Sequence, residues 1–453
     1  MTRRSPSLFT QRRFWPMWVA LSFGAFADNV LRQSLLIGIP YGVIKTPAFG
    51  DSDNAMPFIG ALLPIAIMMF SPLSGQLADK YETSMMFRRT KFVEIILMLV
   101  AAAAFMSGEG AIAIAMLFAM GAQSAFFSPV RTSAMPKYLA ADELVRGNGL
   151  CNAGLYSFIL FGYMVGGGLI VREDGRMLVG AVLIAASTIG WLAALRTLRA
   201  APNDPDLKIS LNWPGQIRAM VGFVRSSRGV APPLIGVAAF FFLSTAVTVI
   251  TPLYARDSLN ADAYVATALN GLFAIGAGLG AMCAARVARG RSGLGFSTFS
   301  VFGAGLLSFL LAGMTPLAAA PAGQVFTIAD LFLTPPGLLL VALFIGTSAL
   351  MGVYIAPLQA AVQRRAPAPI RARIMATGVF ANAVFAIPGS LSTFVITDSN
   401  ADPALAFYAV GAVMLAISAL MLHRRRTLPE GLHDEMLRGA MDDQADLQSG
   451  PRD

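Results

Sequence analysis

Long apolar stretches, separated by short polar or basic segments, run along almost the whole chain. A helix of about 20 predominantly apolar residues crosses the hydrocarbon core of a bilayer. Twelve stretches approach that length and are predicted to be membrane-spanning helices: residues 15–41, 57–77, 91–107, 111–130, 149–171, 176–195, 232–255, 264–285, 294–314, 337–358, 373–396 and 403–422. The pattern therefore predicts an all-α membrane protein.

The composition supports this reading. The chain has 453 residues, of which 56% are apolar and 13% charged, whereas soluble proteins are about 45–50% apolar and about 25% charged. A soluble enzyme with a single anchor is therefore excluded. The net charge of +9 would suggest nucleic acid as a partner of a soluble chain. Here the basic residues lie in short loops between apolar stretches, so we expect no nucleic-acid partner.

The basic residues predict the orientation of the chain in the membrane. With the N-terminus in the cytoplasm, the cytoplasmic segments hold 29 of the 34 Lys and Arg residues. The opposite side holds Lys45, Arg172, Arg176 and Arg256, and Arg32 lies within the membrane. Cytoplasmic loops of membrane proteins are enriched in Lys and Arg. Both termini are thus predicted to be cytoplasmic; the resemblance described below implies that the membrane is a bacterial inner membrane.

A long basic loop divides the spans into two sets of six. We expect an N-terminal tail (1–14), an N-terminal half (15–195), a cytoplasmic linker (196–231), a C-terminal half (232–422) and a C-terminal tail (423–453). Within the linker, residues 210–228 alternate apolar and basic side chains, which fits either an interfacial helix or an unstructured basic segment. The fourth and tenth spans end alike, in FFSP and YIAP, as expected of a duplicated transporter with its site between the halves.

The first span carries polar residues at its middle: Asp28, Asn29, Arg32 and Gln33. Charged residues at that depth are costly and usually functional. Helical spacing places Asp28 and Arg32 on one stripe. Two interpretations remain open: the two residues neutralise each other, or they form a site for a charged substrate or ion.

The segment GQLADKYETSMMFRR, which begins at Gly75, resembles the signature loop of the major facilitator superfamily. Gly75, Asp79, Lys80 and Arg88 match that pattern, whereas Glu82 stands where the family usually has glycine. The resemblance implies twelve helices in two pseudo-symmetric six-helix halves, with this loop as a conformational latch between them. We expect Gly75 to allow close packing of the helix end. Asp79 is expected to face a helix N-terminus or to pair with a basic residue such as Arg88.

Further motifs resemble the bacterial lysophospholipid transporter family, which is similar to the membrane half of fused lysophospholipid acyltransferases. They include GAFADN at 24–29, FFSPVR at 126–131 and ELVRGNGL at 143–150. Ala27 departs mildly from the family's first motif. The resemblance implies alternating-access transport of lysophospholipids, such as lysophosphatidylethanolamine, toward the cytoplasm for reacylation by a separate acyltransferase. It also implies contact with membrane lipids and a monomeric protein.

No motif for chemistry on the lipid is present. An acyltransferase needs a His followed four residues later by Asp, and neither His423 nor His433 has one. The sequence has no glycine-rich phosphate loop with Lys and Ser or Thr. Cys151 and Cys283 lie in separate apolar spans and do not form a metal-binding motif. We therefore expect neither an enzyme nor a bound cofactor or metal.

The candidate substrate-binding residues follow from the resemblance, because helices one, four, seven and ten line the cavity in this superfamily. They are Asp28, Asn29, Arg32, Gln33, Gln123, Phe126, Thr248 and Tyr354. Charge is confined to the first half, which suits an amphipathic substrate. Lys91 and Glu94 are interpreted as a salt bridge near the entry of the third helix. Two alternatives remain: a proton-coupled transporter of a small soluble solute or drug, coupled through Asp28, or a membrane scaffold for an acyltransferase.

Overall fold

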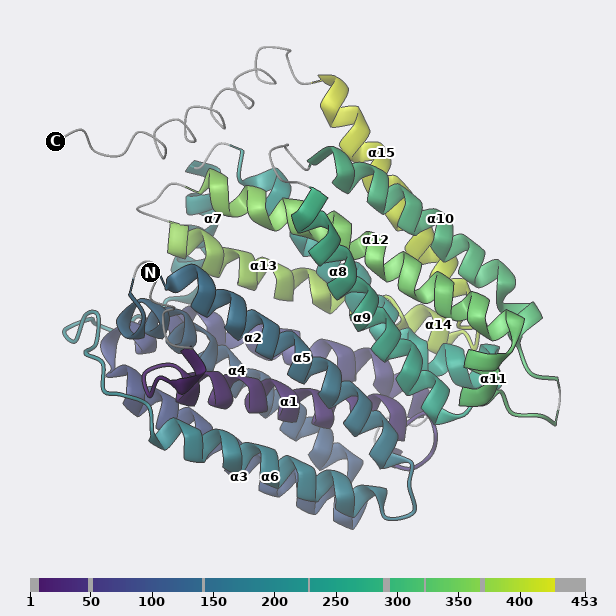
Figure 1. The fold of residues 1–453 in the computed structure, drawn as a ribbon, viewed down its shortest axis with the longest axis horizontal. Coiled ribbons are helices and arrows are strands. Elements are labelled where there is room, and N and C mark those ends of the chain that lie inside the picture. Colours follow the sequence, from purple (N-terminus) through teal and green to yellow (C-terminus); the bar gives the residue numbers. More distant parts are fainter. Residues whose placement is uncertain are drawn as a thin grey trace, which may run out of the picture.

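The computed structural model describes residues 8–47, 52–140, 143–226, 229–287, 294–321, 323–366 and 371–427. Within these residues the regular elements are helices, and no strand is present (Figure 1). The N-terminal half contains α1 (Trp15–Gly38), α2 (Ala55–Lys80), α3 (Thr83–Ser107), α4 (Gly110–Tyr138), α5 (Leu144–Ile170) and α6 (Gly175–Leu195). The linker contains α7 (Trp213–Ser226).

The C-terminal half begins with α8 (Ala231–Leu253), which continues into the π-helical turn η4 (Tyr254–Ser258). It then contains α9 (Ala263–Val287), α10 (Leu294–Ala318), the short α11 (Ile328–Leu333), α12 (Pro335–Arg365), α13 (Arg371–Leu391), α14 (Phe394–Asp398) and α15 (Leu405–Thr427). The short helices α11 and α14 lie at the end of the molecule opposite α7 (Figure 1). We call that end the far side and the other end the linker side.

The predicted spans correspond to these helices. Several helices extend beyond the predicted apolar stretch, as α4 does in reaching Tyr138. Eleven of the described helices are long and apolar enough to cross a membrane. The twelfth helix, α1, is less apolar than these eleven, because its central polar residues lower its mean hydropathy. For the linker residues 210–228, the sequence left open a helix or an unstructured segment. The structure shows a helix there, α7.

The two halves repeat one packing scheme, which confirms the predicted duplication. In the N-terminal half, α1 packs on α5, α2 on α4, and α3 on both α4 and α6. The equivalent helices of the C-terminal half pair in the same way: α8 with α13, α9 with α12, and α10 with α12 and α15. The halves meet through α2 against α13 and α5 against α9, again an equivalent pair of contacts.

Small residues allow the helices to approach closely, as three glycines of α5 show. A Cβ atom at Gly166 would lie 2.5 Å from the backbone oxygen of Val30, and one at Gly162 would lie 2.8 Å from that of Phe26. Gly167 packs against Thr267 of the other half. A Cβ atom at Gly168 would meet no atom within 4 Å. Close backbone contact is the usual basis of helix association in membranes.

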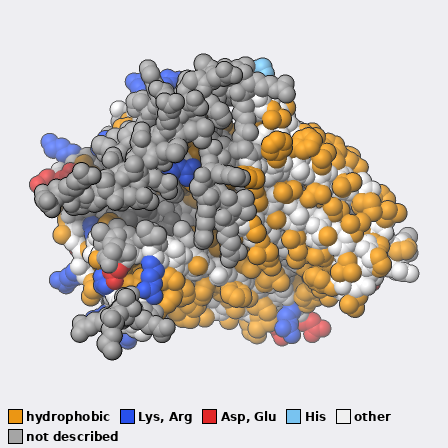
Figure 2. Space-filling model, turned by 45° about the horizontal axis from the view of Figure 1, so that its top comes forward, with side chains coloured by type: hydrophobic (Ala, Val, Ile, Leu, Met, Phe, Trp, Pro, Cys, Tyr) orange, Lys and Arg blue, Asp and Glu red, His pale blue; other side chains and the backbone are white. Residues whose placement is uncertain are grey.

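Apolar side chains also cover much of the outer surface. Figure 2 shows a broad, nearly uncharged apolar area, with Lys and Arg gathered mainly away from it. Large side chains such as Phe299 and Tyr156 are more than 60% exposed, at 68% and 65%. Contiguous exposed apolar area of this extent marks an interaction surface. Together with the eleven apolar helices, it is the surface of a multi-pass membrane protein.

Candidate functional site

The two charged residues of α1 contact different helices. The Asp28 Oδ2 atom accepts a hydrogen bond from Ser124 Oγ of α4 at 2.7 Å. The Arg32 guanidinium donates to the Tyr163 hydroxyl of α5 at 3.2 Å. Within the described N-terminal half, Asp28 and Arg32 form no ion pair with each other. This arrangement argues against the interpretation that they simply neutralise each other.

The two amides of α1 differ in their surroundings. Asn29 donates from Nδ2 to the carbonyl oxygen of Ala25 at 2.7 Å, and its Cβ atom lies beside Gly162 of α5. Gln33 is fully buried, and neither polar atom of its side chain has a hydrogen-bond partner among the described residues. A buried amide without partners is costly. Gln33 is therefore a buried polar group whose hydrogen-bonding capacity is unused in this structure.

A buried ion pair lies beside Asp28. Lys91 Nζ is 2.6 Å from Glu94 Oε2, and both side chains are 1% exposed. Gln123 of α4 donates from Nε2 to the same Glu94 oxygen at 3.0 Å and to the backbone oxygen of Thr90 at 3.1 Å. The predicted ion pair is confirmed, but it is fully buried rather than placed at a helix entry.

Gly24 makes room for this pair on α1. A Cβ atom at Gly24 would overlap Lys91 Nζ and would lie 3.6 Å from Glu94 Oε1. Gly24 lies one turn before Asp28. The face of α1 next to the ion pair of α3 therefore carries a residue without a side chain, followed by a carboxyl group. Sequence reasoning placed Asp28 and Glu94 in separate roles. The signal for their proximity was a glycine one turn before the intramembrane acid.

The other candidate binding residues are engaged in packing. Phe126 has its ring 5.7 Å from that of Phe70. Thr248 donates to the backbone oxygen of Ser244 at 2.8 Å, one turn earlier in α8. Tyr354 is 1% exposed and donates to the backbone oxygen of Gly236 at 2.8 Å. The structure thus brings Gln123 into the cluster around Asp28, whereas Thr248 and Tyr354 belong to the core of the C-terminal half.

Three of the residues predicted to form the latch contact the linker. Asp79 Oδ1 accepts from Asn203 Nδ2 at 2.7 Å, and its backbone oxygen accepts the N–H groups of Asn203 and Asp204. Lys80 Nζ donates to the backbone oxygen of Leu207 at 3.0 Å. Arg88 donates to the backbone oxygen of Thr197 at 3.3 Å. The expected pairing of Asp79 with Arg88 is therefore wrong, because the linker supplies the partners of both side chains.

We call residues 197–212 the strap, because they lie across the linker side of the N-terminal half. Gln76 makes two hydrogen bonds to the backbone of Ser210, and Tyr138 donates to the backbone oxygen of Leu198. Lys137 donates to the backbone oxygen of Ala201 at 2.7 Å. A Cβ atom at Gly75 would meet no atom within 4 Å, so the close packing expected there is wrong in this structure.

Glu82, which replaces the glycine of the superfamily pattern, joins α3 to the strap. Its carboxylate caps the helix by accepting from the N–H groups of Ser84 and Met85, both at 2.9 Å. It also accepts from the N–H group of Ala200 at 2.9 Å. Burial by itself would raise the pKa of Glu82, but these hydrogen bonds outweigh it and lower the pKa below its ordinary value.

We expect Glu82→Gln to lower the melting temperature at neutral pH, with a loss of about 0.5–1 kcal/mol, the usual worth of a helix cap. A carboxyl whose pKa is lowered by folding contributes stability above its unfolded pKa, about 4.3 for Glu, and loses it as the pH falls through the folded value. The two proteins should therefore converge in acid. Thermal unfolding across pH 3–8 checks this, and a constant difference would contradict it.

The linker also contacts the C-terminal half through α7. Phe223 and Val224 pack with Val230, Leu234 and other buried side chains of that half. The Arg373 guanidinium lies 5.2 Å from the centre of the Phe223 ring. The strap and α7 together connect the two halves on the linker side.

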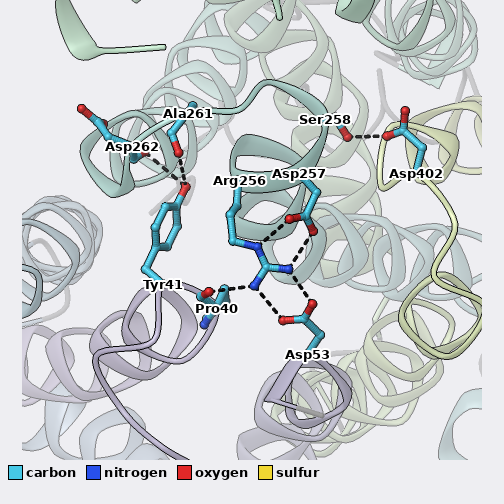
Figure 3. A network of polar contacts seen from close by, with 9 residues as sticks. All are labelled: Pro40, Tyr41, Asp53, Arg256, Asp257, Ser258, Ala261, Asp262 and Asp402. Carbon is cyan, nitrogen blue, oxygen red and sulfur yellow. Dashed lines mark hydrogen bonds and ion pairs between the residues drawn. The ribbon is translucent and has the colours of Figure 1, made fainter. Parts of the chain in front are cut away.

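A polar network joins the halves directly on the far side (Figure 3). Arg256 of η4 donates to Asp53 Oδ1 at 2.9 Å and to the backbone oxygen of Pro40 at 2.7 Å, both in the N-terminal half. It also binds the neighbouring Asp257. Tyr41 donates to the backbone oxygens of Ala261 and Asp262. These contacts join the two halves on the far side in this structure.

No group of three or more His, Cys, Asp or Glu side chains among the described residues is arranged to hold a metal ion. The polar chemistry of the interior is therefore that of carboxylates, ammonium and guanidinium groups, amides and hydroxyls. Such groups can bind and release charged ligands or protons.

Comparison with known proteins identifies the fold family. The profile of the Major Facilitator Superfamily matches residues 21–393. The chain belongs to the Major Facilitator Superfamily. This confirms the resemblance seen in the signature loop.

Relatives and solved structures agree with this assignment. The chain is 27% identical over 276 residues to "Lysophospholipid transporter LplT" of Salmonella heidelberg (strain SL476), and equally to that of Salmonella agona (strain SL483). The match covers 59% of this chain and 64% of the length of those relatives. A crystal structure of the peptide transporter POT in complex with sulfate aligns with a TM-score of 0.66 at 17% identity, covering 90% of this chain and 93% of that one.

The nucleoside transporter NupG aligns over 90% of this chain and 99% of its own length, with a TM-score of 0.62 at 14% identity. These structural likenesses show the fold. They match the repeated six-helix packing described above.

Proposed function

We propose that the protein transports lysophospholipids across the bacterial inner membrane by alternating access. The observation that carries the proposal is the separation of charges on α1. Arg32 and Asp28 each bind a neutral hydroxyl, from Tyr163 and Ser124, instead of each other. A guanidinium suits a phosphate, and a carboxylate suits an ammonium group. The two ends of a zwitterionic head group would match this order along one helix.

The character of the C-terminal half favours an amphipathic substrate. The membrane segment of α8 has no charged residue before Arg256, and α12 has none before its linker-side arginines. The hydroxyls of Thr248 and Tyr354 are bonded to backbone oxygens of their own half. An acyl chain could lie along such a surface without leaving polar groups unpaired. The LplT relatives, named as lysophospholipid transporters, support this choice over a small soluble solute.

The orientation inferred from the basic residues indicates which side of the membrane each end of the molecule faces. With the linker in the cytoplasm, the far side, where Arg256 and Tyr41 join the halves, faces the periplasm. We infer that the transporter delivers its substrate inward, toward a cytoplasmic acyltransferase. The protein would supply that enzyme with its lysophospholipid.

The test of transport is uptake of labelled lysophosphatidylethanolamine by proteoliposomes that contain the purified protein. We expect time-dependent transfer that unlabelled lysophospholipid inhibits and that empty liposomes lack. Labelled dipeptide and nucleoside serve as soluble-solute controls. Transfer of a soluble solute without transfer of the lipid would overturn the proposal, and transfer of neither would favour the scaffold alternative.

The orientation predicts the labelling of single cysteines. A cysteine at position 226, at the end of α7, should react with a membrane-impermeant maleimide only after the cells are opened. A cysteine in place of Lys45, on the predicted periplasmic side, is the matched control and should react in intact cells. Both native cysteines are first replaced by serine. Reaction of the Ser226→Cys protein in intact cells would mean that the orientation is the opposite of the predicted one.

The latch is expected to work through the strap. Asp79→Ala and Asn203→Ala should each change the transport rate while costing about 1 kcal/mol or less in stability, because their hydrogen bond is exposed. The double variant should transport at the same rate as either single variant, since all three proteins lack the same hydrogen bond. Transport rates in proteoliposomes measure this coupling. Strictly additive effects would mean that Asp79 acts without Asn203.

A further inference from the structure

One guanidinium on the far side holds a carboxylate from each half of the molecule. Arg256 donates from Nη1 to Asp53 Oδ1 at 2.9 Å and from Nη2 to Asp53 Oδ2 at 2.5 Å. From Nε and Nη2 it donates to the two oxygens of Asp257, at 2.6 and 2.8 Å. Each carboxylate therefore occupies one edge of the guanidinium (Figure 3). We call Asp53, Arg256 and Asp257 the clasp.

The two carboxylates of the clasp belong to different halves. Asp257 follows Arg256 directly in the chain, so the two residues move together. Asp53 lies in η3 (Ser52–Asn54), directly before α2 of the N-terminal half. Pro40, whose backbone oxygen accepts from Arg256 Nη1 at 2.7 Å, is in the N-terminal half as well. Separation of the halves on the far side would therefore free the Nη1–Nη2 edge and leave the other edge on Asp257.

The clasp is within reach of a ligand from solution. The side chains of Arg256 and Asp53 are 27% and 20% exposed, and that of Asp257 is 38% exposed. Ion pairs that are partly exposed to water contribute little to stability, so a ligand with matching charges can replace them. A phosphate suits the paired donors of a guanidinium as well as a carboxylate does.

We propose that the clasp is an entry site for a zwitterionic phosphate ester, the ethanolamine head group of a lysophospholipid, which inserts between Arg256 and Asp53. The phosphate binds the Nη1–Nη2 edge that Asp53 leaves, and the ammonium binds the Asp53 carboxylate. Each charge exchanges one opposite partner for another. Arrival of the head group thereby stabilises the separated halves on the far side.

The charges of the clasp favour a zwitterion over a simple anion. Two carboxylates face one guanidinium, which leaves one negative charge in excess. A free phosphate would bring further negative charge against Asp53 and Asp257. A head group with an ammonium supplies the cation that Asp53 loses when Arg256 takes the phosphate.

This inference rests on the proposed function and gives it a first binding step. Pro40, which contacts Arg256, is eight residues beyond Arg32 and follows the end of α1. In helical geometry this corresponds to about 12 Å. A head group bound at the clasp would thus have a second guanidinium and a second carboxyl, those of Arg32 and Asp28, further along the same helix.

The distance between the halves on the far side reports the insertion. Spin labels are attached to a Lys45→Cys, Ser399→Cys protein, at exposed positions of the two halves, after both native cysteines are replaced by serine. In uncharged maltoside micelles at constant ionic strength, glycerophosphoethanolamine should shift the measured distances toward longer values. Glycerophosphoglycerol and inorganic phosphate, which lack the ammonium, should need about tenfold higher concentrations, the factor for one lost hydrogen bond to a charged group.

Variants separate the clasp from the site around α1. Arg32→Gln should keep the distance response to glycerophosphoethanolamine, because the clasp is intact. In that background, calorimetric titration should show that Asp53→Asn binds the ethanolamine and glycerol head groups equally. Asp174→Asn, the same change at an exposed position of the far side, should keep the preference for ethanolamine. Should the Asp53→Asn protein fail to fold, the distance response of the Arg32→Gln protein still decides the matter.

Two results would overturn the inference: loss of the distance response in the Arg32→Gln protein, or equal responses of the wild type to head groups with and without the ammonium. Either result alongside lysophosphatidylethanolamine uptake by proteoliposomes would leave the proposed function intact. A normal distance response without any uptake would support the clasp as a head-group site and count against the proposed function.

Discussion

Replacing Lys91 with alanine is expected to destabilise the protein by about 3–5 kcal/mol, because it leaves Glu94 as an unpaired buried charge. Both side chains are 1% exposed, so water cannot replace the lost partner. The variant should accumulate poorly in the membrane and melt well below the wild type. Fluorescence-detected size exclusion after heating measures both effects.

The double variant Lys91→Met, Glu94→Gln is the matched control for this prediction. It removes both charges and keeps side chains of similar size, so it should recover most of the lost stability. The exposed change Lys45→Ala should have little effect. A Lys91→Ala protein as stable as the wild type would mean that the ion pair is not buried in the membrane protein.

Substituting Arg32 with glutamine should reduce lysophospholipid transport by about 10–100-fold, the factor that corresponds to the 1.5–3 kcal/mol typical of a hydrogen bond to a charged group. Arg32→Lys should restore part of this loss, because it keeps the charge but not the paired donor geometry. Initial rates in proteoliposomes at matched protein levels provide the measurement.

Arg172→Gln is the control for the Arg32 variants, since it makes the same exchange at an exposed position on the far side. It should transport at the wild-type rate. If Arg32→Gln folds normally and also transports at that rate, the guanidinium does not bind the head group.

The fold was largely predictable because bilayer thickness fixes the length of each apolar stretch. The same length criterion identified α1 as a span. Although Asp28 lies at its centre, the apolar stretch around it is long enough to cross the bilayer. The repeat was visible only as two similar helix ends, but the structure shows it as equivalent helix pairs in both halves.

The site was less predictable because its contacts join residues far apart in the sequence. Asp28 was a clear candidate, but nothing in the sequence links it to Ser124, and Gly24 was the one signal that linked it to the ion pair of α3. Tyr354 was chosen as a polar residue on a cavity helix, and the structure buries its hydroxyl against Gly236. The partners of Asp79 lie in a linker whose polar residues carry no recognisable pattern.

The strap changes where the chain can be divided. Sequence boundaries would end the N-terminal half at residue 195, yet backbone atoms from Thr197 to Ser210 bond with the side chains and loops of that half. A fragment ending at 195 would expose those groups to water. A fragment ending at Asn212, just before α7, would keep them, so complementation between separately expressed halves should use the later junction.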